Sequence, residues 1–339
     1  MDQTRESIRS GDLKQDRVKA AIDFAAERGI QYVHMDAGWY GPEMKMSSDA
    51  TTVSSDKDLD IPALCKYAES KGIGLMVYVN QRALVQQLDI LLPLYKKWGL
   101  KRYQVRVFVQ IGNQRWSTWL HDAVRKCGEY NLMVDIHDEY RPTGFSRTYP
   151  NLMTQEGIRG NEEMPDATHN TTLPFTRYLA GAGDYTLCYF NNRVKNTKAH
   201  QLAMAAVYYS PLQFMFWYDR PEFYQGEEEL EFWKAIPSVW DDSRALDGEI
   251  GEYIVQARRS GNDWFVGAMT NTEARTITLT TDFLEPGKKY ILHLYEDDDK
   301  LNTRTKVRST HKKIKAGDKL VLKLKASGGA ALHFTPLEK

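Results

Sequence analysis

Cysteine is scarce in this chain, and long apolar runs are missing. The three cysteines, Cys65, Cys127 and Cys188, stand in unlike contexts without a CxxC spacing, so the sequence predicts neither a disulfide framework nor a zinc site. No run of about 18 apolar residues occurs, so we expect no membrane-spanning helix. The first residues, MDQTRESIRSGDLKQDR, lack the apolar core of a secretory signal, so we expect no signal peptide in this chain.

An excess of charge of either sign is also missing. Lys and Arg total 45 and Asp and Glu total 45, which gives a formal net charge of zero. Such a chain has no global field that would draw it to nucleic acid or to an anionic membrane, so we expect neither partner. The basic stretch KKIKAGDKLVLKLK alternates charged and apolar residues, which indicates a strand with one solvated face.

Helical patterns alternate with short apolar runs from residue 14 to about 220. The seven runs are IQYVHMDAGW, IGLMVYVN, YQVRVFVQIG, LMVDIHD, MTQEGIRG, GDYTLCYF and LQFMFWYD. Apolar runs between helices are typical of parallel strands covered on both faces. The pattern predicts an α/β fold, a (β/α)8 or TIM-like barrel that lacks its first strand in this chain. A doubly wound open sheet stays possible, although no GxGxxG follows a first strand.

The pattern changes after the connector SVWDDSRALDG. Segments such as NDWFVGAMTN, ARTITLTTDF and KLVLKLKAS alternate apolar and polar residues and are separated by Gly, Asn and Asp turns. This alternation predicts an antiparallel β-sandwich. We therefore expect a barrel domain over residues 1–248 and a C-terminal β-sandwich over residues 249–339.

Carboxylates gather where two of the predicted strands end, in DIHDEYRPTGFSRTYPNLMTQEGIRGNEE, residues 135–163. Close carboxylates repel unless a cation, a proton or an arginine compensates them. Glu156 and Glu162, each near a glycine, could bind Ca²⁺, which takes oxygen ligands. Neutralisation by Arg141, Arg147 and Arg159 is the alternative, and the sequence leaves both open.

Acids and aromatic residues at the ends of barrel strands are common in glycoside hydrolases, which use two carboxyl groups across the scissile bond. Asp36 could hold sugar hydroxyls or cap the turn after its strand, and Trp39 could stack on a sugar or pack beneath a loop. His137 could contact substrate or serve a structural role. Asp138 is its neighbour, and strand alternation sends the two side chains to opposite faces.

Several of these stretches together resemble glycoside hydrolase family 97, the α-galactosidases and α-glucosidases typical of Bacteroidetes. They are DAGWYG, ESKGIGLMVYVN, the run from VQIGNQ to DIHD, DWFVGAMTNTEARTITL and, most specifically, PTG…RTYPN…EG.RG. Family members have a large β-sandwich, then the barrel, then a small β domain. The resemblance implies that this chain starts after the first sandwich and the first barrel strand. It also implies a periplasmic location and an oligosaccharide or α-glycoside substrate, and it leaves the oligomeric state open.

The resemblance also assigns roles to residues. Glu162 matches the general acid, and Glu156 and Glu162 match calcium ligands. Asp138 falls where the inverting branch has a glutamate that serves as base and metal ligand. Val107 stands where the retaining branch has its nucleophilic aspartate, and a valine cannot be a nucleophile.

The resulting hypothesis is a calcium-assisted, exo-acting α-glycosidase, more active on α-galactosides than on α-glucosides. Two alternatives stay open: an inverting α-glucosidase, and a catalytically silent sugar-binding homologue or fragment.

Overall fold

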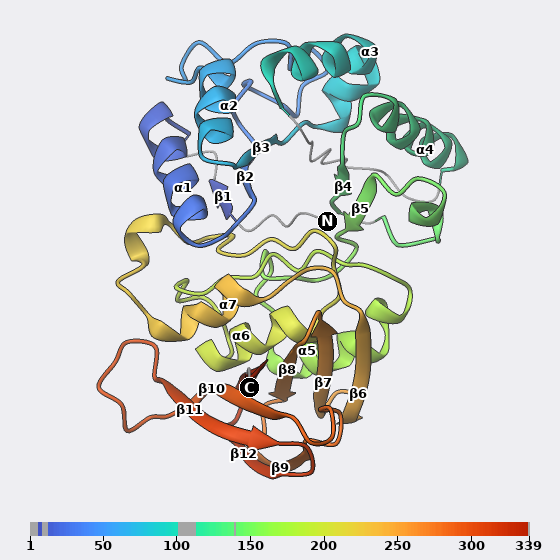
Figure 1. Ribbon diagram of the computed structural model, residues 1–339. Helices are drawn as coiled ribbons and strands as arrows, with labels where there is room; N and C mark the ends of the chain where they lie inside the picture. Colours follow the sequence, from blue (N-terminus) through green and yellow to red (C-terminus); the bar gives the residue numbers. More distant parts are fainter. Residues whose placement is uncertain (1–5, 9–12, 101–112, 139, 338–339) are drawn as a thin grey trace. The chain divides into compact units, whose positions relative to one another are not determined.

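The computed structural model describes residues 6–8, 13–100, 113–138 and 140–337, so Val107 lies outside the described residues. The chain forms two compact units, which do not divide at a single point in the sequence (Figure 1). The first unit comprises Met1–Gly160, Ala180–Phe190 and Ser210–Tyr224. The second comprises Asn161–Leu179, Asn191–Tyr209 and Gln225–Lys339.

The first unit alternates short parallel strands with helices. Its elements are β1 (Glu6–Ile8), α1 (Gln15–Glu27), β2 (Tyr32–Met35), α2 (Ile61–Ser70), β3 (Gly74–Val77), α3 (Gln81–Trp98), α4 (Gln114–Glu129), β4 (Val134–Ile136) and β5 (Leu152–Gln155). Strands β1, β2 and β3 form one parallel sheet, and β4 pairs in parallel with β5. The expectation that no strand precedes the first helix is wrong, because β1 pairs with β2 ahead of α1. This strand has three residues in a polar stretch, too short for a hydrophobic pattern to show it.

Local sequence signals place the helix ends. The Asp60 carboxylate accepts a hydrogen bond from the backbone N–H of Ala63 (2.9 Å) at the start of α2, and Asn80 caps α3 in the same way. Helix α3 ends at Gly99, whose φ of 92° is left-handed and suits a residue without a Cβ. All four residues of β2 are buried, as expected for a strand covered on both faces.

The last two predicted strands of the first unit, GDYTLCYF and LQFMFWYD, are extended segments without a regular ladder. The N–H of Asp184 donates to the carbonyl of Gln155 (3.2 Å), and the N–H of Leu187 donates to the carbonyl of Phe214 (3.0 Å). The N–H of Trp217 returns to the carbonyl of Leu187 (2.9 Å). The predicted strand at residues 103–112 lies outside the described residues. The first unit is thus α/β with parallel strands, and the closed barrel stays a prediction.

The second unit combines an antiparallel β domain with helices. Its elements are α5 (Ala167–Thr172), α6 (Lys198–Val207), α7 (Glu231–Ala235), β6 (Asp242–Glu249), β7 (Tyr253–Ser260), β8 (Asp263–Thr270), β9 (Arg275–Thr280), β10 (Lys289–Asp297), β11 (Val307–Lys315), β12 (Lys319–Leu324) and β13 (Gly329–Pro336). A six-stranded antiparallel sheet has the order β11-β10-β13-β8-β7-β6, and β12 pairs with β9. Apolar residues of both sheets, among them Leu292, Leu332, Leu279 and Leu322, share one core.

The predicted domain boundary at residue 248 needs correction. Strand β6 ends at Glu249 and pairs along its length with β7, so residues 242–249 belong to the C-terminal sheet. Helix α6 packs on this sheet as well, although it precedes the boundary by about forty residues. A Cβ at Gly267 would lie 2.4 Å from the carbonyl oxygen of Ala203, so only glycine permits this approach.

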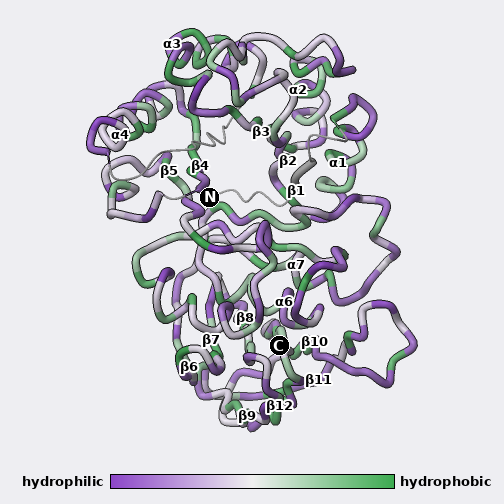
Figure 2. The backbone as a smooth tube through the Cα atoms, turned by 180° about the vertical axis from the view of Figure 1, so that it is seen from behind, coloured by the Kyte–Doolittle hydropathy of each residue, from purple (hydrophilic) through white to green (hydrophobic). Residues whose placement is uncertain are grey.

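No helix in the described part of the chain combines the length and the apolar composition needed to cross a membrane. Hydrophilic and hydrophobic residues are mixed along α3 and α4, as Figure 2 shows.

Candidate functional site

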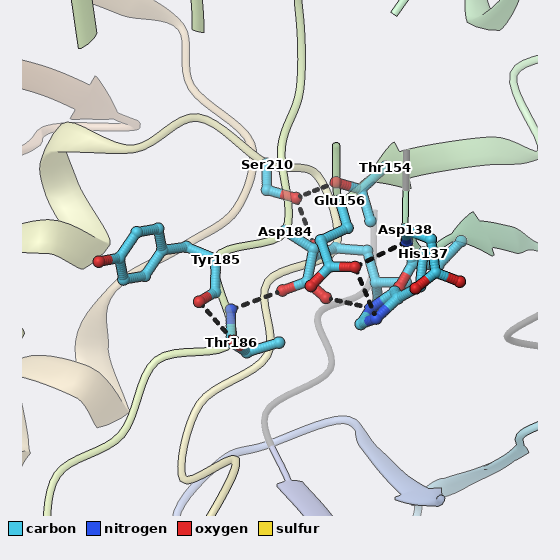
Figure 3. A network of polar contacts seen from close by, with 10 residues as sticks. His137, Asp138, Thr154, Glu156, Asp184, Tyr185, Thr186 and Ser210 are labelled. Carbon is cyan, nitrogen blue, oxygen red and sulfur yellow. Dashed lines mark hydrogen bonds and ion pairs between the residues drawn. The ribbon is translucent and has the colours of Figure 1, made fainter. Parts of the chain in front are cut away.

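The carboxyl ends of β4 and β5 bring polar side chains together in the first unit. His137 and Asp138 follow β4, and Glu156 follows β5. The N–H of Glu156 donates to the carbonyl of Ile136 (2.7 Å), which aligns the two strand ends. Because the strands are parallel, these side chains emerge at one edge of the sheet, the edge where α/β enzymes place their chemistry (Figure 3).

The imidazole of His137 lies among three carboxyl groups. Its Nε2 is 2.7 Å from Asp184 Oδ2 and 3.2 Å from Asp135 Oδ2, and its Nδ1 is 3.4 Å from Glu156 Oε2. The side chain of His137 is fully buried. One imidazole carries at most one positive charge, so these four groups concentrate negative charge in a desolvated place. Such an arrangement favours a bound cation or proton.

Asp184 is a fully buried acid of this cluster that the sequence did not single out. Burial raises its pKa to about 6, while the hydrogen bond with His137 opposes that rise. Its second oxygen accepts the N–H of Thr186 (3.0 Å). The sequence feature that could have revealed Asp184 is its position as the one acid in the otherwise largely apolar run GDYTLCYF. Asp135 was also missed, although it opens the acid-rich stretch.

The backbone around the cluster is strained at three positions. Asp138, Thr186 and Phe216 have φ values of 72°, 57° and 58°, in the left-handed region that non-glycine residues avoid. Each such residue costs on the order of 1–3 kcal/mol, and strain of this kind gathers at functional sites. At Asp138 the strain has a visible use, because its N–H is aimed at Glu156 Oε2 (2.7 Å).

An indole ring supports the cluster from another segment. The Trp217 ring stacks on the ring of His137 (centroids 5.6 Å apart) and on that of His34 in β2 (5.8 Å). Phe214 meets the Trp217 ring edge-on at 5.2 Å. Trp217 is fully buried, so it holds the imidazoles in place and presents no face to solvent.

The other predicted residues have distinct surroundings. Asp36 follows β2 and is 2% exposed. Trp39 is fully buried; its indole N–H donates to the carbonyl of Tyr78 (2.6 Å), and its ring packs against Tyr40 and Tyr95. The packing interpretation therefore describes Trp39 in this structure.

Glu162 belongs to the second unit and is partly buried. The preceding Asn161 is anchored by its amide group, which donates to Gln201 Oε1 on α6 (3.0 Å). This anchor ties the segment that carries Glu162 to a helix.

The donor set of the cluster suits a hard cation. Asp135, His137 and Asp184 place one ligand atom each within 4.8 Å of one another, and all three are buried. Carboxylate oxygens are the ligands that Ca²⁺ takes, and Glu156 adds another at this edge. The residues therefore fit a bound divalent cation, with the imidazole as the least suitable of the donors for Ca²⁺.

The first unit has parallel strands between helices, with buried acids at the strand ends, and an antiparallel sheet follows it along the chain. These features are typical of an α/β enzyme with a C-terminal β domain. The model of a family described as "Glycoside hydrolase 97" matches residues 2–158. A second model, described as "Glycosyl-hydrolase 97 C-terminal, oligomerisation", matches residues 239–335. The chain belongs to glycoside hydrolase family 97, which confirms the resemblance seen in the sequence motifs.

Curated relatives agree with this assignment. The chain is 33% identical over 338 residues to a retaining alpha-galactosidase of Bacteroides thetaiotaomicron, a match that covers 93% of this chain and 50% of the relative. It is 31% identical over 328 residues to a probable retaining alpha-galactosidase of Streptomyces bingchenggensis, with 94% and 50% covered. The chain therefore spans about half the length of the curated relatives that it matches.

Solved structures of family 97 enzymes superpose closely on this chain and support an α/β enzyme with a C-terminal sheet. A family 97 enzyme from Pseudoalteromonas sp. strain K8, in complex with acarbose, superposes with a TM-score of 0.88 at 29% identity. That match covers 99% of this chain and 61% of the other. A beta-arabinopyranosidase at 22% identity has a TM-score of 0.80, which shows a shared fold alone.

Proposed function

We propose that this chain carries the catalytic residues of an exo-acting α-glycoside hydrolase that prefers α-galactosides. The observation that carries the proposal is the buried cluster of His137, Asp135, Glu156 and Asp184 at the ends of parallel strands in a family 97 chain. The two curated relatives are named as α-galactosidases, and a related enzyme was solved with acarbose, which supports a sugar substrate.

In this proposal Glu162 is the general acid that protonates the leaving glycosidic oxygen. Asp138 is the base that takes a proton from the attacking water. A pair of carboxyl groups performs both proton transfers in inverting enzymes, about 6.5–9.5 Å apart, whereas retaining enzymes need a nucleophile about 5–5.5 Å from the acid. Val107 favours inversion, because a valine stands at the position that the resemblance assigns to the nucleophile, whereas the names of both curated relatives favour retention.

Substrate binding by Asp36, His137 and Trp39 stays a prediction. Asp36 is buried directly after β2, and the carboxyl ends of parallel strands are where α/β enzymes place residues that bind substrate. His137 contacts carboxylates and Trp39 packs among aromatic rings, so each supports the site in addition to the predicted contact with substrate.

Calcium is proposed as the cofactor, with Glu156 and Glu162 as ligands. A bound Ca²⁺ supplies positive charge that offsets the clustered carboxylates and fixes their orientation. Glu156 is buried and already oriented by the N–H of Asp138, which prepares its carboxylate for such a role.

The decisive experiment is turnover of aryl α-galactosides and aryl α-glucosides by the full chain. We expect Glu162→Gln to lower kcat by about 10²–10⁴-fold on substrates with poor leaving groups, as for loss of a general acid. Glu163→Gln, at the exposed neighbouring position, is the matched control and should change little. Equal activity of wild type and Glu162→Gln would refute the assignment of the acid.

The stereochemical outcome tests the mechanism separately. The anomer first released, followed by proton NMR, should be the inverted one, and Val107→Asp should raise activity if the rest of the site is intact. Net retention with a sugar trapped on another residue would show that the nucleophile has been misplaced.

A catalytically silent sugar-binding homologue is the second candidate, favoured by Val107. If the chain is such a homologue, calorimetry should detect binding of galactose or of an α-galactoside, and neither wild type nor any of these variants should hydrolyse the substrate. Binding of calcium by wild type and its loss in Glu156→Gln would support the cofactor under either candidate.

A further inference from the structure

Three of the eight histidines of the chain lie side by side in the C-terminal sheet. His293 on β10 is directly opposite His311 on β11 and, on its other side, directly opposite His333 on β13. Leu292 and Leu294, which flank His293 along β10, belong to the core between the sheets. Because side chains alternate along a strand, the histidine row lies on the face of the sheet away from that core.

The imidazole rings of His293 and His311 face each other through their Nδ1 atoms. His293 Nδ1 is 2.8 Å from His311 Nδ1. On the far side of its ring, His311 Nε2 is 2.8 Å from Glu228 Oε1. A carboxylate accepts hydrogen bonds, so it selects the tautomer of His311 that carries hydrogen on Nε2. The lone pair of His311 Nδ1 then points at His293.

The arrangement matches the way proteins prepare a histidine for a metal. A ligating imidazole usually donates its other N–H to a carboxylate, which fixes the ring and raises the basicity of the ligating nitrogen. Glu228 stands in that relation to His311. Without a metal, His293 donates its Nδ1 hydrogen to His311 Nδ1. When that hydrogen moves to Nε2 of His293, both Nδ1 lone pairs are available and no proton is lost overall.

Access and protonation suit this role. The side chain of His311 is 43% exposed, so an ion can reach the pair from solvent. Burial, together with the neighbouring imidazoles of His333 and His311, lowers the pKa of His293. Neutral imidazole, the form that binds metals, therefore prevails at His293 near neutral pH.

We propose that His293 and His311 bind one borderline divalent transition-metal ion, of the class of Zn²⁺ or Cu²⁺, through their Nδ1 atoms. Water completes the coordination, so the site is weaker than a structural zinc site with four protein ligands. Tetrahedral coordination at about 2.0–2.1 Å per nitrogen puts the two nitrogens about 3.3 Å apart, so the rings must separate by about 0.5 Å.

Chemistry sets this site apart from the acidic cluster of the first unit. Imidazole suits Zn²⁺ and Cu²⁺, whereas Ca²⁺ takes oxygen ligands. His333 lies next in the row but belongs elsewhere: its Nε2 is 2.8 Å from Asp263 Oδ2, and its ring stacks on Phe265. His333 is thus a built-in control for a histidine of the same row outside the pair.

A consequence for the sheet follows from the position of the pair. Strand β11 is the edge strand of the six-stranded sheet, and β10 is its only neighbour in that sheet among the described residues. A metal held by one histidine from each strand connects the edge to the sheet interior. Binding to the folded state alone then raises the melting temperature, and the rise grows with the logarithm of the metal concentration once that concentration exceeds Kd.

The test uses the full chain and ZnCl₂, with isothermal titration calorimetry and thermal unfolding. We expect wild type to bind zinc at this site, and His311→Ala and His293→Ala to lose at least about tenfold in affinity together with the rise in melting temperature. Glu228→Gln should weaken binding by about 10–100-fold, as expected for the partner of a ligating histidine. His333→Ala should bind as wild type does.

Circular dichroism before titration checks that each variant is folded, and the His293→Gln variant replaces His293→Ala if the latter is not. Zinc held by the acidic cluster would be seen as a component common to all variants. Absence of any zinc binding in wild type, or equal binding in wild type, His311→Ala and His293→Ala, would overturn the proposal. The outcome is independent of turnover.

Discussion

The two units of this molecule differ in how their strands place polar side chains. In the second unit, alternating strands send apolar side chains into one core, as in β12, where buried Leu320, Leu322 and Leu324 alternate with exposed residues. In the first unit, polar groups are buried where strands end, and the fully buried His137 lies among acids. The arrangement in the second unit serves stability, and the arrangement in the first unit serves chemistry.

Left-handed non-glycine residues occur in both units, and those of the second unit, Met164, Lys306 and Ser327, lie outside its strands. At the acidic cluster, three left-handed non-glycine residues accompany short strands. In the six-stranded C-terminal sheet, strands of eight to nine residues pair in regular register, with a shift between Ala245 and Asp247. A strained backbone persists only where the surrounding contacts hold it in place. The strained residues around the acidic cluster therefore lower the stability of the first unit at that point. Four substitutions test this contrast, from the largest expected effect to the smallest.

Phe334→Ala should produce the largest loss of stability. Phe334 is fully buried and meets Phe283 edge-on at 5.5 Å, so its removal leaves a cavity that costs about 3–5 kcal/mol. Urea unfolding followed by fluorescence measures the loss. Val321→Ala, at a 57% exposed position of β12, should stay within about 0.5 kcal/mol of wild type. Similar losses for both would mean that the C-terminal core does not carry the stability.

Asp297→Asn probes a partly buried acid of the second unit. Burial raises the pKa of Asp297 from 3.8 to about 6, although its carboxylate accepts hydrogen bonds from Thr197 Oγ1 (2.7 Å) and from the N–H of Gly329 (3.2 Å). Between those two pKa values the folded state binds more protons than the unfolded state, so stability falls as pH rises through this window. The full effect is at most about 3 kcal/mol.

The measurement for Asp297 is a series of unfolding free energies from about pH 4 to about pH 7, on either side of the folded-state pKa. The amide introduced by Asp297→Asn cannot ionise, so the variant should lack this component of the decline and gain on wild type as pH rises. A constant difference between the two proteins across the series would contradict the expected titration.

Asp184→Asn should affect activity more than stability, provided that the proposed turnover is observed. The carboxylate accepts from both His137 and Thr186, and an amide has one oxygen for the two donors. Loss of such a supporting contact typically costs about 10–100-fold, here expected in kcat/KM. Asp263→Asn, in the acid–histidine pair with His333 in the second unit, is the control and should leave kcat/KM unchanged. Equal losses of kcat/KM in Asp184→Asn and Asp263→Asn would contradict the view that the acid–histidine contacts of the first unit alone support activity.

Asp60→Ala should have the smallest effect, about 1 kcal/mol, because it removes the side-chain cap of α2. Asp58→Ala, two residues earlier and exposed, is the control, since its side chain does not cap the helix. Thermal unfolding compares the two. An equal shift in both variants would indicate a general effect of charge in place of capping.

Much of the fold was predictable because its periodic signals are local. The strand YVHM lies within the apolar run IQYVHMDAGW that predicts it, and period-two alternation predicts the antiparallel sheet. The short β1 was missed because three residues give no period to detect. The boundary at residue 248 was misplaced because the exposed residues of β6 show little apolar alternation.

The candidate site was predictable in part. The stretch 135–163 revealed an acidic cluster, and His137 and Glu156 do approach each other there. Asp184 could not be found in the same way, because it is 47 residues from His137 along the chain. Sequence proximity reveals acids of one stretch, whereas an acid from another segment joins them only when the backbone folds.

The sequence by itself determined the α/β and antiparallel character of the two regions, the family and the acid-rich stretch, because these depend on local periodicity and on contiguous motifs. Tertiary structure decided that α6 packs on the C-terminal sheet, that Asp184 completes the cluster around His137, and that His293 meets His311 across two strands. Each of these joins segments distant in sequence. Their contacts depend on strand register and on packing, which no local pattern encodes.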